Sequence, residues 1–406
     1  MKRFSWGKRK IYNACFCVWT LFFSMVFFSS IAEAGESFET HHNARRYGMG
    51  GAYISVVEDE DALFFNPAAI ARNTGIYWTI ADLGVGASDI SESIDAFSDL
   101  SDDSTFESAL NDLYGEPLWL GATGKTSVML PFFAFAYFYD VDVSFMANNP
   151  VAPTLEGNYI TDTGFALGSG WSIAKIFEMG FAAKYITRTG NRETFGAGTI
   201  ANIVSGTDST DAIFDSFDAS GVGYALDFGA NLTIPTPVRP TFSFVWKNMG
   251  NTKFRADDDE LTPPRIDQEM TIGGSLFISL PLVHIVPALE FRHLESSELD
   301  LGQKLHLGLE LGLPLVDVRA GLYQGYLSYG AGLGLGLARI DFASWGAEIG
   351  GYPGQIESRR YMLQLSIRLG FDVGIGGSAA SSSSASRGGS SNSGGSFSRK
   401  RPKMRR

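Results

Sequence analysis

Hydrophobic and polar side chains alternate along several stretches of the chain. Between Phe133 and Phe145 the odd positions are all aromatic or valine, whereas the even positions are small or acidic apart from Phe138. The segments 222–234, 305–313 and 361–371 repeat this alternation. Successive side chains of a β-strand point to opposite faces, so each of these strands has one face that is apolar over its whole length. An apolar face opposite a small or polar one is typical of a transmembrane β-barrel.

Fourteen segments have this strand pattern, and the connections between them mostly alternate between long and short. The predicted strands are 76–86, 118–127, 132–146, 163–175, 177–190, 221–234, 239–250, 268–280, 284–294, 305–313, 315–325, 329–337, 338–348 and 360–371. Long connections fall at 87–117, 147–162, 191–220, 251–267, 295–304 and 349–358, while 326–328 is short where a longer loop is expected. Outer-membrane barrels have short periplasmic turns and long external loops, so an even strand number leaves both termini in the periplasm. The predicted fold class is all-β, a transmembrane antiparallel β-barrel of about 14 strands at residues 76–371.

Composition favours this barrel over a soluble β-sandwich, whose strands also alternate. Aromatic residues make up 13% of the chain and glycine occurs 47 times, a combination that suits lipid-facing strands with aromatic girdles. A sandwich strand seldom stays apolar over seven alternate positions on one face. After residue 34 the chain has no apolar run of about 18 residues, so no transmembrane helix is predicted there.

Residues 1–34 have the features of a secretory signal peptide. Five basic residues precede a largely apolar stretch at 11–31, and Ala32-Glu33-Ala34 forms a small-x-small cleavage pattern with Gly35 as the new N-terminus. The alternative is a retained membrane anchor, because the apolar stretch is nearly long enough to span a bilayer. Both cysteines, Cys15 and Cys17, lie in this segment. Its removal would leave a chain without disulfides, thiolate metal sites or a cysteine nucleophile.

Residues 372–406 form a tail of low complexity, rich in serine and glycine. From residue 377 onward the tail holds seven basic residues and no acid, whereas the whole chain has a net charge of −12. Such sequence cannot bury a core and behaves as a flexible tether. The tail either is solvated without a function of its own or binds peptidoglycan-associated acids or an acidic periplasmic or secretion-complex partner. Nucleic acid is not expected as a partner for a periplasmic terminus.

A short irregular segment precedes the first predicted strand. It contains the glycines Gly48, Gly50 and Gly51, four consecutive acids at 58–61, and Phe64-Phe65-Asn66-Pro67-Ala68. Glycines permit turns that other residues resist, and Pro67 fixes one φ angle while it pushes Asn66 toward an extended conformation. We expect residues 35–75 to form a compact plug that the barrel encloses.

This segment resembles the N-terminal hatch of the FadL family, outer-membrane barrels that take up long-chain fatty acids and other hydrophobic compounds. The resemblance lies in Gly48-Met49-Gly50-Gly51-Ala52 and in Asn66-Pro67-Ala68, which stands where that family carries its NPA motif. The same opening is similar to that of the PorV family, barrels that serve type IX protein secretion. The resemblance to FadL implies a 14-stranded barrel with a hatch in its lumen. We assign ligand or gating positions to Gly48, Gly50, Gly51, Phe64, Phe65, Asn66, Pro67 and Ala68.

The first long loop has helical spacing of apolar residues. One stripe comprises Ile94, Phe97 and Leu100, and a second comprises Phe106, Leu110 and Leu113. These faces either pack on the barrel rim or form an external groove that collects a hydrophobic small molecule. The FadL resemblance implies such a groove in the corresponding loop.

The sequence holds no recognisable catalytic constellation. The histidines after residue 34 are His41, His42, His284, His293 and His306, and none lies in a serine-hydrolase or metal motif. The four acids at 58–61 lack the ligand spacing of a calcium loop and are expected to form salt bridges with lumen arginines. We therefore predict no enzyme activity, no cofactor and no metal.

Three functions remain for the predicted barrel in outer-membrane lipid. The first is a FadL-like channel, the second a PorV-like partner of a secretion complex, and the third a structural protein tethered by its tail. The last predicted strand ends in Phe371, and an aromatic end resembles the signal that the barrel insertion machinery recognises, although this chain continues beyond it. A FadL channel also needs an inward kink in its wall, yet residues 133–145 contain neither glycine nor proline.

Overall fold

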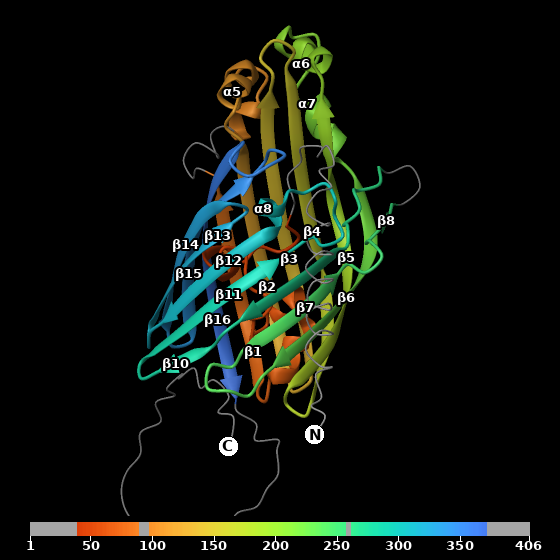
Figure 1. The fold of residues 1–406 in the computed structure, drawn as a ribbon. Coiled ribbons are helices and arrows are strands. Elements are labelled where there is room, and N and C mark those ends of the chain that lie inside the picture. Colours follow the sequence, from red (N-terminus) through yellow and green to blue (C-terminus); the bar gives the residue numbers. More distant parts are fainter. Residues whose placement is uncertain (1–38, 89–96, 257–260, 372–406) are drawn as a thin grey trace, which may run out of the picture.

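A computed structural model describes residues 39–88, 97–256 and 261–371, and these fold into a closed antiparallel β-barrel (Figure 1). Fourteen strands form the ring, which closes where β1 pairs with β16. The ring strands are β1 (Ile76–Ala87), β2 (Leu118–Leu130), β3 (Phe133–Asn148), β4 (Thr154–Ile173), β5 (Phe177–Phe195), β6 (Ser220–Thr233), β7 (Thr241–Lys247), β9 (Glu269–Ser275), β11 (Val283–Phe291), β12 (Leu305–Gly312), β13 (Val316–Tyr323), β14 (Tyr326–Leu335), β15 (Ala338–Glu348) and β16 (Glu357–Phe371). Two short strands, β8 (Phe254–Arg255) and β10 (Ile278–Leu280), pair with β6 and β11 respectively. The predicted fold class and strand number are confirmed.

The largest difference from the predicted strands concerns the second long connection. Residues 154–162, predicted as loop, extend β4 and pair with the C-terminal half of β3, from Asn148↔Thr154 to Asp140↔Asp162. Only residues 149–153 connect the two strands. The stretch 154–162 contains polar residues, such as Glu156 and Asn158, which obscure the alternation that identifies the lipid-facing part of a strand.

The barrel wall is much taller on one side than on the other. The strands β4 and β5 contain 20 and 19 residues, whereas β7 and β9 contain 7 each. Four short helices lie within the long loops: α5 (Phe106–Asp112), α6 (Ala197–Val204), α7 (Asp211–Phe214) and α8 (Leu301–Lys304). Figure 1 shows α5, α6 and α7 above the tall strands. Among the described residues, no helix is both long and apolar enough to cross a membrane.

The two rims of the barrel differ in their connections. We call the rim with the long loops the loop rim. The opposite rim, here called the turn rim, carries the connections 131–132, 174–176, 234–240, 281–282, 313–315 and 336–337. The start of β1 and the end of β16 also lie at the turn rim, since Ile76 pairs with Phe371. The connection 324–325 at the loop rim is as short as a turn, because Gln324 and Gly325 both adopt left-handed φ angles, 49° and 91°.

The barrel exterior is apolar where the strands alternate. On β3 the side chains of Phe133, Phe135, Tyr137 and Tyr139 are 39% to 53% exposed, whereas the intervening Ala134 and Ala136 are buried. Leucine and aromatic residues on the other strands continue this surface, including Leu83, Leu167, Phe181, Leu226, Phe242, Leu289 and Leu363. A continuous apolar exterior on a closed barrel is the surface of a membrane-spanning protein.

Residues 39–75 lie inside the barrel, and we call them the inner segment. It contains α2 (Ala44–Gly48), α3 (Ala62–Phe65) and the 3-10 helix Pro67–Arg72, here called η2. Its apolar side chains form one buried cluster with small residues on the inner faces of β3 to β6, among them Ala136, Ala166, Ala182 and Ala225. Small wall residues leave the space that the inner segment fills.

Candidate functional site: the segment inside the barrel

The Asn-Pro-Ala turn of the inner segment is fixed by the side chain of Asn66. Its Oδ1 accepts a hydrogen bond from the backbone amide of Ala68 at 3.1 Å, which caps η2, and Pro67 occupies the first turn of that helix. Its Nδ2 donates to the carbonyl oxygen of Ile54 at 2.8 Å and to Oδ1 of Asn231 on β6 at 2.7 Å. Asn66 therefore joins two parts of the inner segment to the barrel wall.

The same turn lies directly against glycines of three neighbouring strands. A Cβ atom on Gly180 of β5 would lie 2.3 Å from the carbonyl oxygen of Pro67. A Cβ on Gly229 of β6 would lie 2.3 Å from Oδ1 of Asn66, and one on Gly170 of β4 would lie 3.0 Å from the Pro67 oxygen. The two distances of 2.3 Å are shorter than real Cβ contacts, and a Cβ on Gly170 would also lie 2.6 Å from the amide nitrogen of Ala71. The turn therefore sits where only glycine leaves room. We call Gly170, Gly180 and Gly229 the glycine seat.

Substitution of Gly180 by alanine is expected to displace the turn from the glycine seat. The added methyl group would meet backbone atoms of Pro67 and Ala68, so the expected cost is about 1–3 kcal/mol of unfolding free energy. Urea unfolding midpoints and proteolysis within residues 44–69 would measure this change. Gly274→Ala is the matched control, because a Cβ there lies 3.6 Å from its nearest neighbour, the Thr241 oxygen. Equal midpoints for the two variants would show that the seat imposes no constraint.

The glycines Gly48, Gly50 and Gly51 make a second close contact, with β12, β13 and β14. Gly50 and Gly51 adopt left-handed φ angles of 62° and 84°, which glycine alone adopts without strain. A Cβ on Gly50 would lie 2.2 Å from the carbonyl oxygen of Leu307, and one on Gly48 would lie 3.1 Å from Cα of Gly330. The ring of His306 donates a hydrogen bond from Nδ1 to the carbonyl oxygen of Gly50 at 2.8 Å. Turn geometry and close approach together require glycine here.

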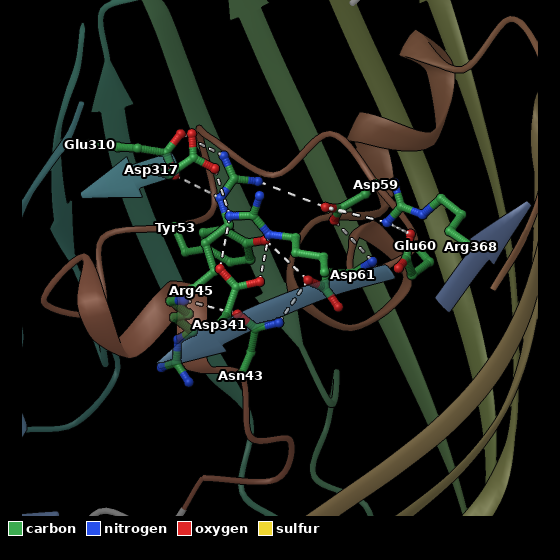
Figure 2. Close-up of polar contacts among 12 residues, drawn as sticks. Asn43, Arg45, Tyr53, Asp59, Glu60, Asp61, Glu310, Asp317, Asp341 and Arg368 are labelled. Carbon is green, nitrogen blue, oxygen red and sulfur yellow. Dashed lines mark hydrogen bonds and ion pairs between the residues drawn. The ribbon is translucent and has the colours of Figure 1, made fainter. Parts of the chain in front are cut away.

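A buried group of charges anchors the first helix of the inner segment. Arg45 and Arg319 each donate from Nε to Glu310 Oε2 at 2.9 Å. Arg319 also donates to Asp341 at 2.8 Å, and Arg339 donates to Asp317 at 2.6 Å. Figure 2 shows Arg45 between the acids of this group. Buried charges of both signs in contact satisfy one another, and removal of one partner leaves an uncompensated charge.

The acidic run also contacts cations of the wall. Asp61 forms an ion pair with Lys125 of β2 and accepts hydrogen bonds from Asn43 at 2.8 Å and Tyr53 at 3.0 Å. Glu60 pairs with Arg368 of β16 (Figure 2). Among the described residues, the acids and histidines close enough to share a metal ion are His284, Glu310 and Asp317. Both carboxylates of that trio already contact arginines, which disfavours a cation there.

Phe64 and Phe65 are buried within the lumen, 4% and 3% exposed. Phe64 stacks on His41 with ring centroids 4.2 Å apart and meets the edge of Phe138, and Phe65 packs edge-on against Tyr53. A cavity of about 10 Å³ adjoins Phe64, enough for roughly one water molecule. An acyl chain could reach these rings only if the inner segment moved.

The apolar stripes of the first long loop are covered by other elements of the loop rim. Leu100, Phe106, Leu110 and Leu113 are at most 5% exposed and Phe97 is partly buried, whereas Ile94 lies outside the described residues. The described side chains of the two stripes pack with α6, α7 and the loop-rim ends of β3 to β5, and we call this group the loop cluster. Its buried residues are Leu100, Phe106, Ala109, Leu110, Leu113, Leu118, Val143, Phe145, Ala147, Leu155, Phe195, Ile200, Ile203, Ile213 and Phe217.

The rest of that loop is acidic and hydrogen-bonded. Ser104 donates from its hydroxyl and from its backbone amide to Asp102, at 2.7 and 2.8 Å, and these bonds lower the pKa of Asp102. Asp103 accepts from the amide of Thr210 at 2.7 Å and so links the first loop to the loop before β6.

The proposed cleavage residues Ala34 and Gly35 lie outside the described residues.

A polar layer separates the loop cluster from Phe64, and the sequence analysis did not identify it. His41 donates from Nδ1 to the carboxylate of Asp140 at 2.9 Å, and His42 lies 3.2 Å from Asp142 on the same strand. A cavity of about 20 Å³ lies in this layer, lined also by Asn158 and Arg188 among others. The signal that could have revealed the layer is the pair of adjacent histidines together with the two acids on the inner face of β3.

The wall beside the inner segment is continuous at β3. That strand pairs with β4 along its whole length and with β2 from Phe133 to Phe145, in both cases without a register shift. A bulge occurs in β1 instead, where the pairing with β16 shifts between Thr79 and Ala81. Ile80 at this bulge is 41% exposed on the outside, and Asp82 just beyond it is buried beside Lys125.

Comparisons with known proteins find similar folds but no sequence relative. No protein-family model matches the chain, and no curated protein matches it. The toluene transporter TodX of Pseudomonas putida matches with a TM-score of 0.47 and 8% identity, over 84% of this chain and 100% of that one. The CymD monoaromatic hydrocarbon channel matches with a TM-score of 0.44 and 9% identity, over 83% of this chain and 99% of that one.

A FadL homologue of Pseudomonas aeruginosa also matches, with a TM-score of 0.32 and 10% identity over 84% of this chain and 100% of that one. The chain is similar to FadL-type hydrophobic-compound channels. At these identities and TM-scores its function must be argued from its own residues.

The inner segment fills the lumen of the barrel and closes it in this conformation. The inner segment contacts opposite sides of the wall, the glycine seat on β4 to β6 and the second glycine contact on β12 to β14. All of the contacts described above are noncovalent, and the chain beyond residue 34 contains no cysteine that could lock the segment in place. Among the described residues, no covalent bond ties the side chains of the inner segment to the wall.

Proposed function

We propose that the protein is an outer-membrane channel for hydrophobic molecules, and that the inner segment closes it at rest. The observation that carries this proposal is a noncovalently held segment that fills the lumen at the level of the lipid-facing surface. An entirely structural barrel would have no need for a separate buried segment of this size. The motif resemblance to the FadL family agrees with the proposal.

Two apolar groups lie along one side of the barrel and suggest the nature of the solute. The loop cluster lies at the loop rim, and Phe64 lies below it beside Phe138. The polar layer of His41, His42 and Asp140 lies between them. A long-chain fatty acid, with an apolar chain and one polar end, suits such a sequence of apolar and polar surfaces. Other hydrophobic molecules remain candidates in the same class.

Simultaneous replacement of Phe64 and Phe65 by alanine is expected to weaken binding of a long-chain fatty acid. Contacts of two phenyl rings with an acyl chain contribute roughly 3–6 kcal/mol before ordering costs, so the expected loss of affinity is at least about tenfold. Equilibrium binding of labelled oleate to the purified protein would measure it. Phe133→Ala with Phe135→Ala is the matched control, because these two rings face lipid.

Two results would contradict the channel proposal. The first is equal oleate affinity in the double variant and the wild type, and the second is saturable binding by neither. In either case a PorV-like partner barrel, which binds a secretion complex and transports nothing, would be the better hypothesis. The continuous wall at β3 and the small volume of the cavity beside Phe64, about 10 Å³, favour that alternative.

We further propose that residues 1–34 are a cleaved signal peptide, that residues 35–75 are the hatch, and that the tail 372–406 lies in the periplasm. The turn rim would then face the periplasm and the loop rim the outside, because outer-membrane barrels place their short turns inside. Single cysteines at Ser98 and Ser393 would test this orientation with an impermeant thiol reagent on intact cells. Labelling at position 98 alone is expected, and labelling at position 393 alone would invert the orientation.

A further inference from the structure

The turn rim is apolar at each of its six connections. Each connection presents at least one large apolar side chain that is 38% to 80% exposed. One from each is Phe132, Ile176, Val238, Leu282, Leu315 and Leu337. Turns that end in water are normally polar or glycine-rich, and exposed apolar patches on a folded protein mark a contact surface.

The charges of the two rims are opposite in sign. The six connections of the turn rim contain two charged residues, Lys175 and Arg239, and no acid. At the loop rim, the stretches 97–117 and 196–219 contain ten acids and neither lysine nor arginine. The turn rim is therefore complementary to an apolar surface that carries negative charge.

Backbone conformation indicates that the side chains of the turn rim are needed there. Phe132 and Leu282 adopt left-handed φ angles of 69° and 67°, and Lys175 and Arg239 adopt 59° and 37°. Such angles cost a bulky side chain roughly 1–2 kcal/mol, and glycine or asparagine normally occupies them. At the loop rim three of the five left-handed positions other than glycine, 149, 248 and 251, are asparagines, and the other two are His293 and Gln324. Bulky side chains at strained positions point to a contact outside the barrel. The guanidinium of Arg239 also lies over the ring of Phe277, 4.2 Å from its centroid.

We infer that the turn rim docks into the headgroup region of an anionic phospholipid leaflet. Its apolar tips enter the boundary between headgroups and acyl chains, and Lys175 and Arg239 meet lipid phosphates. This surface is continuous with the lipid-facing exterior, since Leu280 and Leu313 beside the tips are 52% and 45% exposed. If the channel proposal also holds, a solute that leaves through the turn rim enters the leaflet rather than water.

A fluorescent probe at the tip of the rim tests this placement. Leu282→Cys is labelled with an environment-sensitive dye in a chain whose Cys15 and Cys17 are replaced by serine, and the protein is reconstituted in vesicles of phosphatidylcholine and phosphatidylglycerol. Val151→Cys is the matched control, because Val151 is an apolar tip of the loop rim, 95% exposed. We expect nitroxide-labelled lipid to quench the dye at 282, and aqueous iodide to quench it about fivefold less than at 151. Iodide quenching at 282 equal to that at 151 would place the rim in water and favour a protein partner instead.

The contribution of the two cations is tested separately with the same probe. In the wild type, quenching by nitroxide-labelled phosphatidylglycerol should exceed quenching by nitroxide-labelled phosphatidylcholine. In the double variant Lys175→Gln with Arg239→Gln, this preference for phosphatidylglycerol should fall, by roughly fivefold for each of the two cations. Lys253→Gln with Arg255→Gln, at the loop rim, should leave the preference unchanged. An unchanged preference in the first variant would overturn the proposed contact with lipid phosphates.

Discussion

Deletion of residues 44–69 is expected to convert a closed barrel into an ion-conducting pore. The deleted stretch contains both glycine contacts and fills the lumen with packed side chains. Without it, the inner faces of the strands present charged residues such as Glu310, Arg319 and Asp341 to the open lumen, and water would enter. Single-channel recordings in planar bilayers should show steps of conductance that the wild type lacks.

The barrel itself should survive this deletion. Its lipid-facing surface and its ladder of paired strands do not involve the inner segment, and Arg319 still compensates Glu310 and Asp341 after Arg45 is lost. Heat-modifiable migration on a gel would verify that the variant is folded. A deletion of residues 377–406 is the control and should leave the conductance unchanged. A folded 44–69 deletion that conducts no ions would contradict the view that the inner segment closes the lumen.

The second large effect is expected from Arg319→Met. The side chain of Arg319 is fully buried and donates to Glu310 and Asp341, so its loss leaves carboxylates with fewer partners in a site shielded from water. Breaking one member of such a buried charge group typically costs 3–5 kcal/mol. We therefore expect a much lower urea midpoint and faster proteolysis within the inner segment.

Arg359→Met is the matched control for this substitution. Arg359 pairs with Glu357 at 2.5 Å, but both side chains are about a third exposed, 34% and 36%. Exposed ion pairs contribute about 0–1 kcal/mol, so this variant should unfold almost like the wild type. Equal midpoints for Arg319→Met and Arg359→Met would show that the buried charge group does not hold the inner segment.

The strands were predictable because a barrel in a membrane imposes alternation on each strand. The pattern at Phe133–Phe145 and at 361–371 results from lipid on one face and the lumen on the other, and both are short-range features. The extension of β4 was not predictable in this way, because above the lipid the outer face has no reason to be apolar. Residues 154–162 form a strand because they pair with β3.

The candidate site was only partly predictable. The glycine cluster and Asn66-Pro67 marked the inner segment as unusual, since glycine permits turns that other residues resist and proline fixes one φ angle. The glycine seat was not predictable, because Gly180 and Gly229 lie more than a hundred residues from the Pro67 turn and their pairing with it is a property of the folded barrel. For the same reason the sequence did not show that His41 would stack on Phe64 and contact Asp140.

If the inner segment closes the channel at rest, it must leave its place when a hydrophobic molecule binds, and thiol accessibility measures this movement directly. Ser55 is buried in the inner segment and its carbonyl oxygen accepts a hydrogen bond from Ser275 of β9, so Ser55→Cys reports movement away from the wall. The rate of its reaction with a water-soluble thiol reagent is measured with and without saturating oleate, in a chain with Cys15 and Cys17 replaced by serine. We expect oleate to raise this rate at least about tenfold, while the exposed Ser98→Cys reacts at an unchanged rate. Oleate that binds to saturation without changing the rate at position 55 would contradict the account.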